Sequence, residues 1–246
     1  MKSIDSFLDS KALQIINSLL DDKNIQQKWL LTNNDLKKQA DVINKLEKEL
    51  PEAWVPLRIA CSAFLTQRTS LKSTNTPQTL SDWKYVWDEL KPIVSKKGNT
   101  SMNFTFWLKS RGNHHYAIKF GEYFEAYCKT RDWNLKNTLK DLNDLRSLND
   151  AEEVKKWWMQ FKGIGVQYAK NIPMDEMDTR FIDFVKIDYR LSKMIDKMGG
   201  HNLNSKEKQD LFVRLAKNLK MTSWEIDRFC FNFHKDILSK LHQGVI

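Results

Sequence analysis

Apolar residues recur along most of this chain at the three- and four-residue spacing of an amphipathic helix. Between residues 151 and 161, for example, Val154, Trp157, Trp158 and Phe161 occupy positions i, i+3, i+4 and i+7, so a helix would place them on one face. No segment alternates between apolar and polar residues as a half-buried strand does. The pattern predicts an all-α protein with helices over residues 3–20, 35–50, 56–66, 80–90, 102–109, 114–129, 135–148, 151–161, 166–172, 189–198, 206–219 and 224–241.

Prolines and polar segments mark the expected breaks between these helices. Pro51 ends the helix that precedes it, and Pro56 is expected in the first turn of the next one, where a missing N–H costs nothing. The polar stretch 70–79 is typical of a loop. Pro173 is expected to open an acidic loop, because three acids follow it closely.

The composition fits a folded helical protein of 246 residues. Hydrophobic residues make up 41% of the chain and charged residues 29%, which argues against global disorder. Eight glycines and five prolines are few for a turn-rich all-β protein or a glycine-rich nucleotide-binding fold. The formal net charge of +9 and the pI near 9.3 predict a polyanionic partner.

Neither a membrane span nor a secretory signal is expected. No uncharged apolar run reaches the roughly 18 residues of a transmembrane helix, and the N-terminal segment carries Asp5 and Asp9 in place of a long apolar core. Cys61, Cys128 and Cys230 lie far apart, which gives no disulfide framework or metal-ligand spacing and suggests a reducing compartment. We expect an intracellular protein that contacts no membrane.

A basic stretch runs from Lys91 to Arg131, with eight Lys or Arg residues and only two acids. Cations beside aromatic rings can hold phosphates and stack on unpaired bases. The same composition also fits a solvated basic face that covers ordinary core aromatics. The side chains in question are Phe104, Phe106, Trp107, His114, His115 and Tyr116.

A short turn, Lys162-Gly163-Ile164-Gly165, separates two predicted helices. Both glycines can adopt a positive φ and leave their amides unobstructed, and Ile164 would plug the turn into the core. The amides and dipole of the following helix would hold a phosphate without reading sequence. A plain helix–helix connection is the alternative interpretation.

Asp188 stands 23 residues after Gly165, behind an apolar stretch and directly before a predicted helix. By itself such an aspartate is typical of an N-cap, since its carboxylate can accept the free amides of the next turn. Capping would also hold the carboxylate ionised and oriented, so a structural role and a catalytic role are compatible.

These segments together resemble the helix-hairpin-helix DNA glycosylase superfamily, which includes endonuclease III and the adenine, oxoguanine and alkylpurine glycosylases. Residues 161–169 (FKGIGVQYA) resemble the family hairpin L-P-G-[IV]-G-x-x-x-A, and residues 187–188 match its [VI]-D. Residues 65–70 (LTQRTS) resemble its L-x-Q-x-T segment, and residues 111–117 match an intermediate segment loosely. The resemblance covers roughly residues 55–200.

The resemblance implies an all-α, two-lobed fold with a helix-hairpin-helix motif and a DNA cleft between the lobes. One lobe would be discontinuous and combine residues 1–54 with residues 180–246. The central lobe would span residues 55–179 and end in the helix-hairpin-helix over residues 151–172.

The resemblance also implies roles for individual residues. Asp188 would be the catalytic carboxylate, and Gln67 with Arg68 would fill the gap left by an extruded base. The hairpin residues that bind DNA phosphate would be Lys162, Gly163, Ile164, Gly165 and Gln167. Candidates for stacking on the flipped base are Tyr168, Trp54, Phe64, Tyr116 and Trp224.

Three departures from the family pattern bear on the activity. Lys162 replaces the usual hairpin proline, and only Cys230 follows the hairpin, so the iron–sulfur cluster of endonuclease III is not expected. Gln167 stands where lyase-competent relatives carry a catalytic lysine, and an amide cannot form a Schiff base. We therefore expect a monofunctional enzyme, with Lys170 as the alternative amine.

The expected function is a base-excision repair glycosylase that acts on double-stranded DNA with a damaged or mismatched base, with a lean towards alkylated or deaminated bases. No organic cofactor and no metal site are expected, although the resemblance admits a monovalent cation at the hairpin. A monomer in the cytoplasm, near the nucleoid, or in the nucleus is expected. The alternatives are an inactive helix-hairpin-helix DNA-binding protein, an oxidised-purine glycosylase/lyase that uses another lysine, and a helical protein- or RNA-binding scaffold.

Overall fold

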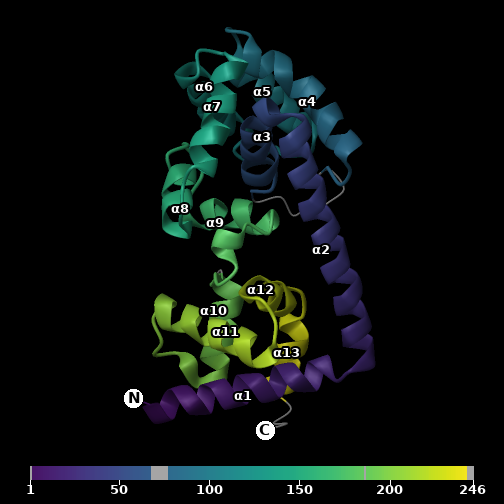
Figure 1. Cartoon of the computed structure of the whole chain (residues 1–246), viewed down its shortest axis with the longest axis vertical. Helices are drawn as coiled ribbons and strands as arrows, with labels where there is room; N and C mark the ends of the chain where they lie inside the picture. Colours follow the sequence, from purple (N-terminus) through teal and green to yellow (C-terminus); the bar gives the residue numbers. More distant parts are fainter. Residues whose placement is uncertain (1, 68–76, 186, 243–246) are drawn as a thin grey trace. The chain divides into compact units, whose positions relative to one another are not determined.

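The computed structural model describes residues 2–67, 77–185 and 187–242, and every regular element in these ranges is helical (Figure 1). The α-helices are α1 (Lys2–Leu20), α2 (Lys23–Glu49), α3 (Pro51–Leu57), α4 (Leu80–Ser95), α5 (Thr100–Ser110), α6 (Ala117–Thr130), α7 (Leu135–Arg146), α8 (Ala151–Met159), α9 (Val166–Asp175), α10 (Tyr189–Ile195), α11 (Ser205–Leu219), α12 (Ser223–Asn232) and α13 (His234–His242). Two segments have the wider π-helical winding, η1 (Arg58–Leu65) and η3 (Asp196–Gly200), and η2 (Thr179–Phe181) is a 3₁₀ turn. The all-α prediction is confirmed.

The chain divides into two compact units. Unit 1 comprises Met1–Lys37 and Met177–Ile246, and unit 2 comprises Lys38–Glu176. The resemblance predicts a first boundary at residue 54, whereas the observed division falls within α2. Residues 38–54 belong to unit 2 because the second half of α2 and the whole of α3 bury side chains among the central helices, Leu46 and Trp54 included.

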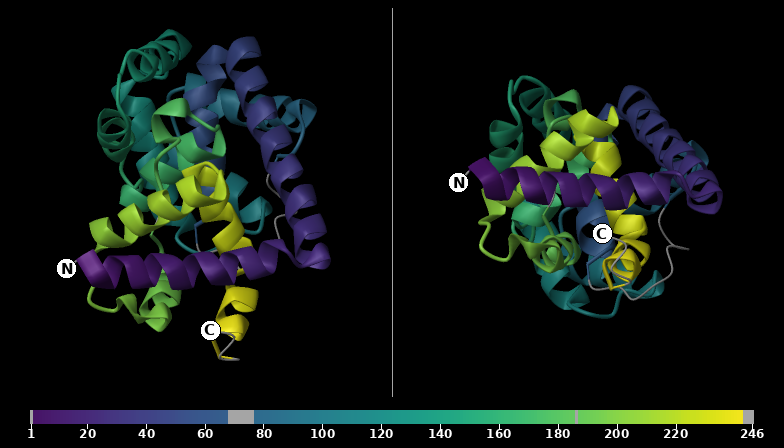
Figure 2. Two further views of the ribbon diagram at one scale, coloured as in Figure 1. Left: turned by 60° about the horizontal axis from the view of Figure 1, so that its bottom comes forward. Right: turned by 90° about the horizontal axis from the view of Figure 1, so that it is seen from below.

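Unit 1 has one core, to which helices from both ends of the chain contribute. Ile16 of α1 is buried with Phe212 of α11 and Ile237 of α13, and α1 contacts α11 and α13. Figure 2 shows α1 in purple passing the yellow C-terminal helices. Trp29 meets Phe229 edge-on, with ring centroids 5.4 Å apart. The core therefore depends on segments that are almost the whole chain length apart.

Unit 2 has an aromatic core. Phe104 of α5 stacks on Phe124 of α6 with ring centroids 4.0 Å apart, and Phe64 of η1 stacks on Phe120 at 4.7 Å. Gly121 lets α6 approach α5 closely, because a Cβ there would collide with the Thr105 hydroxyl and a backbone carbonyl. This packing fixes η1 against α6, which matters for the site described below.

Pro56 departs from its expected position. Pro51 is the proline that begins a helix, whereas Pro56 lies inside α3 and is buried. A proline in a helix cannot donate to the carbonyl four residues earlier, and here the Glu52 carbonyl instead accepts from the Thr138 hydroxyl of α7 at 2.7 Å. The substitute bond lets the helix continue into the wider winding of η1.

Three further helix boundaries differ from those that the hydrophobic periodicity predicts. Helix α2 begins twelve residues before its predicted start, where Asp22 accepts from the Asn24 amide at 2.9 Å. Pro173 lies within α9 and opens no loop. The single helix expected over 224–241 is two helices, because Phe233 leaves helical dihedral angles (φ −105°, ψ 20°) and packs its ring against Phe229, 4.9 Å away.

No helix in the described ranges combines the length and apolarity needed to cross a bilayer.

Candidate nucleic-acid interface

The predicted hairpin between α8 and α9 is present as a tight turn. Its chain reverses where the Ile164 amide donates to the Phe161 carbonyl at 3.0 Å. Ile164 is buried, as expected of a plug. Gly165 then serves as the N-cap of α9 with extended dihedral angles.

The two hairpin glycines have different roles, although either can adopt a positive φ. Gly163 has φ +86°, and a Cβ there would lie 2.6 Å from Cδ2 of Tyr123 and 2.8 Å from Cε1 of Phe64. Gly165 has φ −83° and open space around the position of a Cβ. The fold of unit 2 therefore requires glycine at 163 but not at 165.

The start of α9 presents bare backbone amides. Gly165 has no side chain to cap them, and Gly165, Val166 and Gln167 are all exposed. The first amides of a helix have no partner within the helix, and the helix dipole favours an anion beside them. A phosphate group has the charge and the acceptor oxygens that suit this end.

Contacts join η1 and the residues just after it to the hairpin and α9. Nε2 of Gln67 donates to the Gly163 carbonyl at 3.0 Å, and the hydroxyl of Tyr168 forms a hydrogen bond with Thr66. Two sequence motifs about a hundred residues apart thus meet in space. Burial raises the pKa of Tyr168, an effect that the Thr66 hydrogen bond opposes.

A buried ionic cluster fixes the far end of α9. Arg58 of η1 is 1% exposed; its Nη2 donates to the Ile172 carbonyl at 2.8 Å and its Nε lies 3.5 Å from Glu176. Glu176 also accepts from Arg146 at 3.0 Å. Arg146 in turn pairs with Glu47. Buried charges are tolerated when they are paired in this way, so Glu176 anchors α9 and does not belong to a solvated acidic loop.

Asn113 supports the end of η1. Its side chain is 1% exposed, and Nδ2 donates to the Phe64 carbonyl at 2.6 Å and to the Leu65 carbonyl at 3.3 Å. The last carbonyls of a helix lack partners within it, and the Asn113 amide supplies them. The loosely matched segment 111–117 therefore holds in place the backbone that leads to Gln67.

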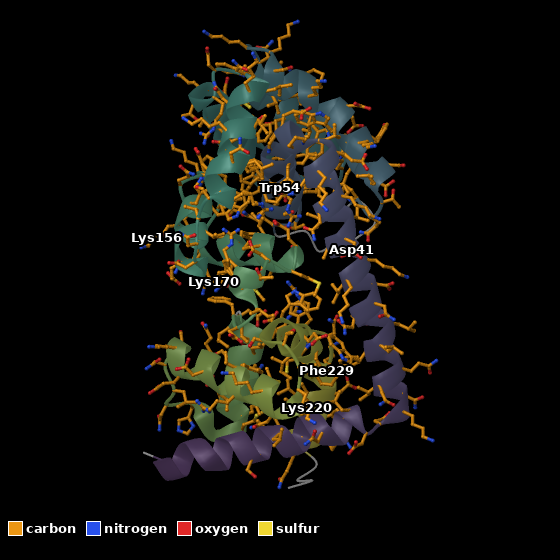
Figure 3. The ribbon with its side chains drawn as sticks, viewed as in Figure 1. Asp41, Trp54, Lys156, Lys170, Lys220 and Phe229 are labelled. Carbon is orange, nitrogen blue, oxygen red and sulfur yellow. The ribbon has the colours of Figure 1, made fainter. Side chains whose placement is uncertain are left out.

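Burial divides the candidates for stacking on a base into core residues and accessible residues. Trp54, Phe64 and Trp224 are core residues, and Figure 3 shows Trp54 surrounded by other side chains of unit 2. A ring in a packed core cannot receive a base unless its neighbours move. Tyr168 is half-buried and Tyr116 is 41% exposed, so these two remain accessible.

Asp188 in unit 1 is the N-cap of α10, as its position in the sequence predicts. Oδ1 accepts from the Arg190 amide at 2.9 Å and from the Leu191 amide at 3.0 Å, and the residue is half-buried. Two bonds to one oxygen fix the carboxylate in a single orientation. The guanidinium of Arg190 lies over the Phe231 ring, 4.5 Å from its centroid.

The remaining predicted site residues differ in their exposure to solvent. Lys162 and Gln167 are exposed and Lys170 is half-buried; Figure 3 labels Lys170 on α9. Arg68 lies outside the described residues.

No group of three or more His, Cys, Asp or Glu side chains in the described part of the chain could hold a metal ion. A cation at the hairpin would need main-chain carbonyl oxygens as ligands. The Gly163 carbonyl accepts from Gln67, so a cation bound to that oxygen would share it with the Gln67 amide.

Comparisons of the chain with models of protein families, with curated proteins and with solved structures found no match.

Sequence reasoning missed two residues that shape this region, Lys119 and Tyr123. Tyr123 lies against Gly163, and Nζ of Lys119 lies 5.7 Å from the centroid of the Tyr123 ring. The spacing of positions 116, 119 and 123 could have identified them, because it places the three side chains on one face of a helix.

Proposed function

We propose that this protein is a DNA N-glycosylase that removes a damaged or mismatched base from double-stranded DNA. The observation that carries the proposal is the hydrogen bond from Gln67 to the Gly163 carbonyl. It brings together the two motifs that the glycosylase resemblance assigns to lesion-gap filling and to phosphate binding.

The hairpin supports phosphate binding through geometry alone. The turn fixes the start of α9, and the bare amides at Gly165 and beyond suit a phosphate oxygen. Contacts of this kind position a protein on DNA without reading sequence. A base inside a duplex is out of reach, so the enzyme would extrude it. Gln67 would then leave the Gly163 carbonyl and fill the gap beside the orphaned partner base.

Asp188 would carry the hydrolysis. The bond between C1′ and the base nitrogen breaks, and its electron pair leaves with the base, which takes a proton. The Asp188 carboxylate stabilises the positive charge that develops on the sugar and accepts a proton from the water whose oxygen bonds to C1′. Because Oδ1 accepts two amide hydrogens, Oδ2 is the oxygen assigned to this chemistry.

The proposed enzyme has no lyase step. Gln167, exposed in the first turn of α9, carries an amide, and an amide cannot form a Schiff base with the sugar. Lys170 lies three residues further along the same helix and is half-buried. It is the amine to examine if covalent trapping succeeds.

The two-lobed glycosylase arrangement with a DNA cleft, the monomeric state and the location near the nucleoid or in the nucleus stay predictions. So does the preference for alkylated or deaminated bases.

The proposal is tested by incubating the protein with duplexes that each carry one lesion, across uracil and thymine mismatches, alkylated purines and oxidised purines. Hot alkali then cleaves any abasic site, and a parallel sample receives borohydride. Strand scission after alkali without a trapped complex is the expected result. Duplex binding with no scission across the whole panel would instead support a DNA-binding protein without catalysis, and a trapped complex would overturn the monofunctional assignment.

A further inference from the structure

A pair of exposed rings stands at the start of α6. The His115 and Tyr116 rings lie 4.2 Å apart, tilted by 58°, and both side chains are exposed. Tyr116 has φ +60°, a left-handed conformation that is strained for a bulky residue. The buried Asn113, three residues earlier, fixes the loop to the end of η1. The rings are therefore presented on a rigid support.

These rings continue along one face of α6 towards the hairpin. We call Tyr116, Lys119 and Tyr123, together with His115, the α6 aromatic face. Lys119 is exposed and its Nζ lies 5.7 Å from the Tyr123 ring centroid, while Tyr123 lies against Gly163. Phe120 connects the two tyrosines from beneath, 6.1 Å from Tyr116 and 6.4 Å from Tyr123. The face begins at the hairpin and ends at the exposed Tyr116.

The charge around this face favours a polyanion. The stretch from Lys91 to Arg131 has eight basic residues against Glu122 and Glu125, although Arg111 and Arg131 pair with Glu89 and Asp141. Lys119 on the face and Lys162 of the hairpin are both exposed. The structure also separates the aromatics of this stretch, since Phe104 and Trp107 are core residues. Phe106 and His114 are exposed as well, but His115 and Tyr116 are the exposed rings that share the α6 aromatic face with Lys119. Rings beside a cation bind unpaired bases by stacking and their phosphates by charge.

We propose that the α6 aromatic face binds a single-stranded segment of DNA, with one unpaired base stacked on Tyr116 and a phosphate held by Lys119. The inference rests on the proposed function in taking DNA as the ligand. It adds a second contact, separate from the hairpin amides and from Asp188, which needs no damaged base.

The test measures binding of a fluorescein-labelled 12-nucleotide oligo-dT by anisotropy, across a range of salt concentrations. Tyr116→Leu keeps an apolar side chain but loses the ring, and should weaken binding by about 5- to 100-fold. Tyr116→Phe should bind like the unaltered protein. Lys119→Gln should lower the slope of log K against log salt by about 0.7, the value for one single-strand phosphate contact.

Two variants control for general effects. Tyr85→Leu removes another exposed tyrosine, 63% exposed on α4, and Lys129→Gln removes an exposed cation at the far end of α6. Both should bind oligo-dT within about twofold of the unaltered protein, because neither residue lies on the face. Thermal unfolding of each variant checks that it is folded.

The outcomes separate this inference from the glycosylase proposal. Equal oligo-dT affinity for Tyr116→Leu, Tyr116→Phe and the unaltered protein would overturn the α6 aromatic face while leaving base excision intact. Binding to neither single-stranded nor duplex DNA would overturn both. A Tyr85→Leu defect as large as that of Tyr116→Leu would show that any exposed ring contributes to binding, and would overturn a defined face.

Discussion

The starts of α9 and α10 solve the same physical problem in opposite ways. Each helix begins with amides that lack partners inside the helix. At α10 the Asp188 carboxylate accepts two of them, whereas at α9 the N-cap is Gly165, which has no side chain to offer. One helix start holds a negative charge of its own, and the other leaves room for a negative charge from outside.

The difference shows how one local rule can serve two functions. A carboxylate fixed by amides is held in one orientation, which suits a group that must stabilise a developing cation. Bare amides at the end of a helix suit a phosphate. Exchanging the two residue types would remove both properties, and the following variants test each side of the comparison.

The largest expected effect is at the capped helix start. Asp188→Asn keeps the shape and the capping ability of the residue but removes the charge. We expect the single-turnover excision rate to fall by about 100- to 10,000-fold, with duplex affinity nearly unchanged. Alkali-dependent strand scission measures the rate.

Asp188→Ala separates charge from capping. It should lose the same activity and also lower the free energy of unfolding by about 1 kcal/mol, the usual contribution of an N-cap side chain. If Asp188→Asn retained activity, the carboxylate would have only a capping role.

The next effect concerns the two hairpin glycines. Gly163→Ala should lower the free energy of unfolding by about 1–3 kcal/mol, since its φ is +86° and the new Cβ would press on Tyr123 and Phe64. Gly165→Ala meets open space and should lower the free energy of unfolding by only about 0.5–1 kcal/mol, because alanine is a poorer N-cap than glycine. Urea unfolding gives both values.

The affinity of the Gly165→Ala variant for duplex DNA tests whether the amides at the start of α9 bind phosphate. Gly165→Ala should weaken duplex binding although it leaves the fold intact, because a methyl group would stand where the phosphate approaches. Unchanged affinity for this variant would mean that the start of α9 is an ordinary helix connection.

A smaller effect is expected at the contact between the two motifs. Gln67→Leu removes the hydrogen bond to the Gly163 carbonyl and should cost about 0.5–1.5 kcal/mol of stability. Excision should fall as well, because the side chain could no longer pair with the orphaned base. Loss of stability with full excision would make Gln67 a brace for the hairpin and nothing more.

The smallest effect is at Lys162. It is exposed and would contribute one phosphate contact, so Lys162→Gln should lower the salt slope of duplex binding by about 0.9 without altering thermal unfolding. An unchanged slope would place Lys162 outside the DNA contact.

The sequence predicted most of what is local. The helices, the reversal at Gly163 and the cap at Asp188 follow from spacing and residue type, because a helix or a cap depends on neighbours within one or two turns. The error at Pro56 has a nonlocal cause, because the Thr138 hydroxyl of α7 donates to the Glu52 carbonyl that the proline cannot serve. The end of α9 around Pro173 is also held by a distant segment, since Arg58 donates to the Ile172 carbonyl. At Phe233 the break is local, because its ring packs against Phe229, four residues earlier.

The candidate site was predictable only in part. The positions of Gln67 and Gly163 in the sequence say nothing about a bond between them, and the aromatics in one stretch look alike until burial separates Phe104 from Tyr116. Helix formation depends on short-range preferences and net charge depends on composition. The sequence alone therefore determined a basic, all-helical chain, with a glycine turn before α9 and an aspartate before α10. The packing of distant segments decided which glycine is indispensable, which rings are accessible and which motifs meet, because contacts between distant segments form only when the whole unit closes around its core.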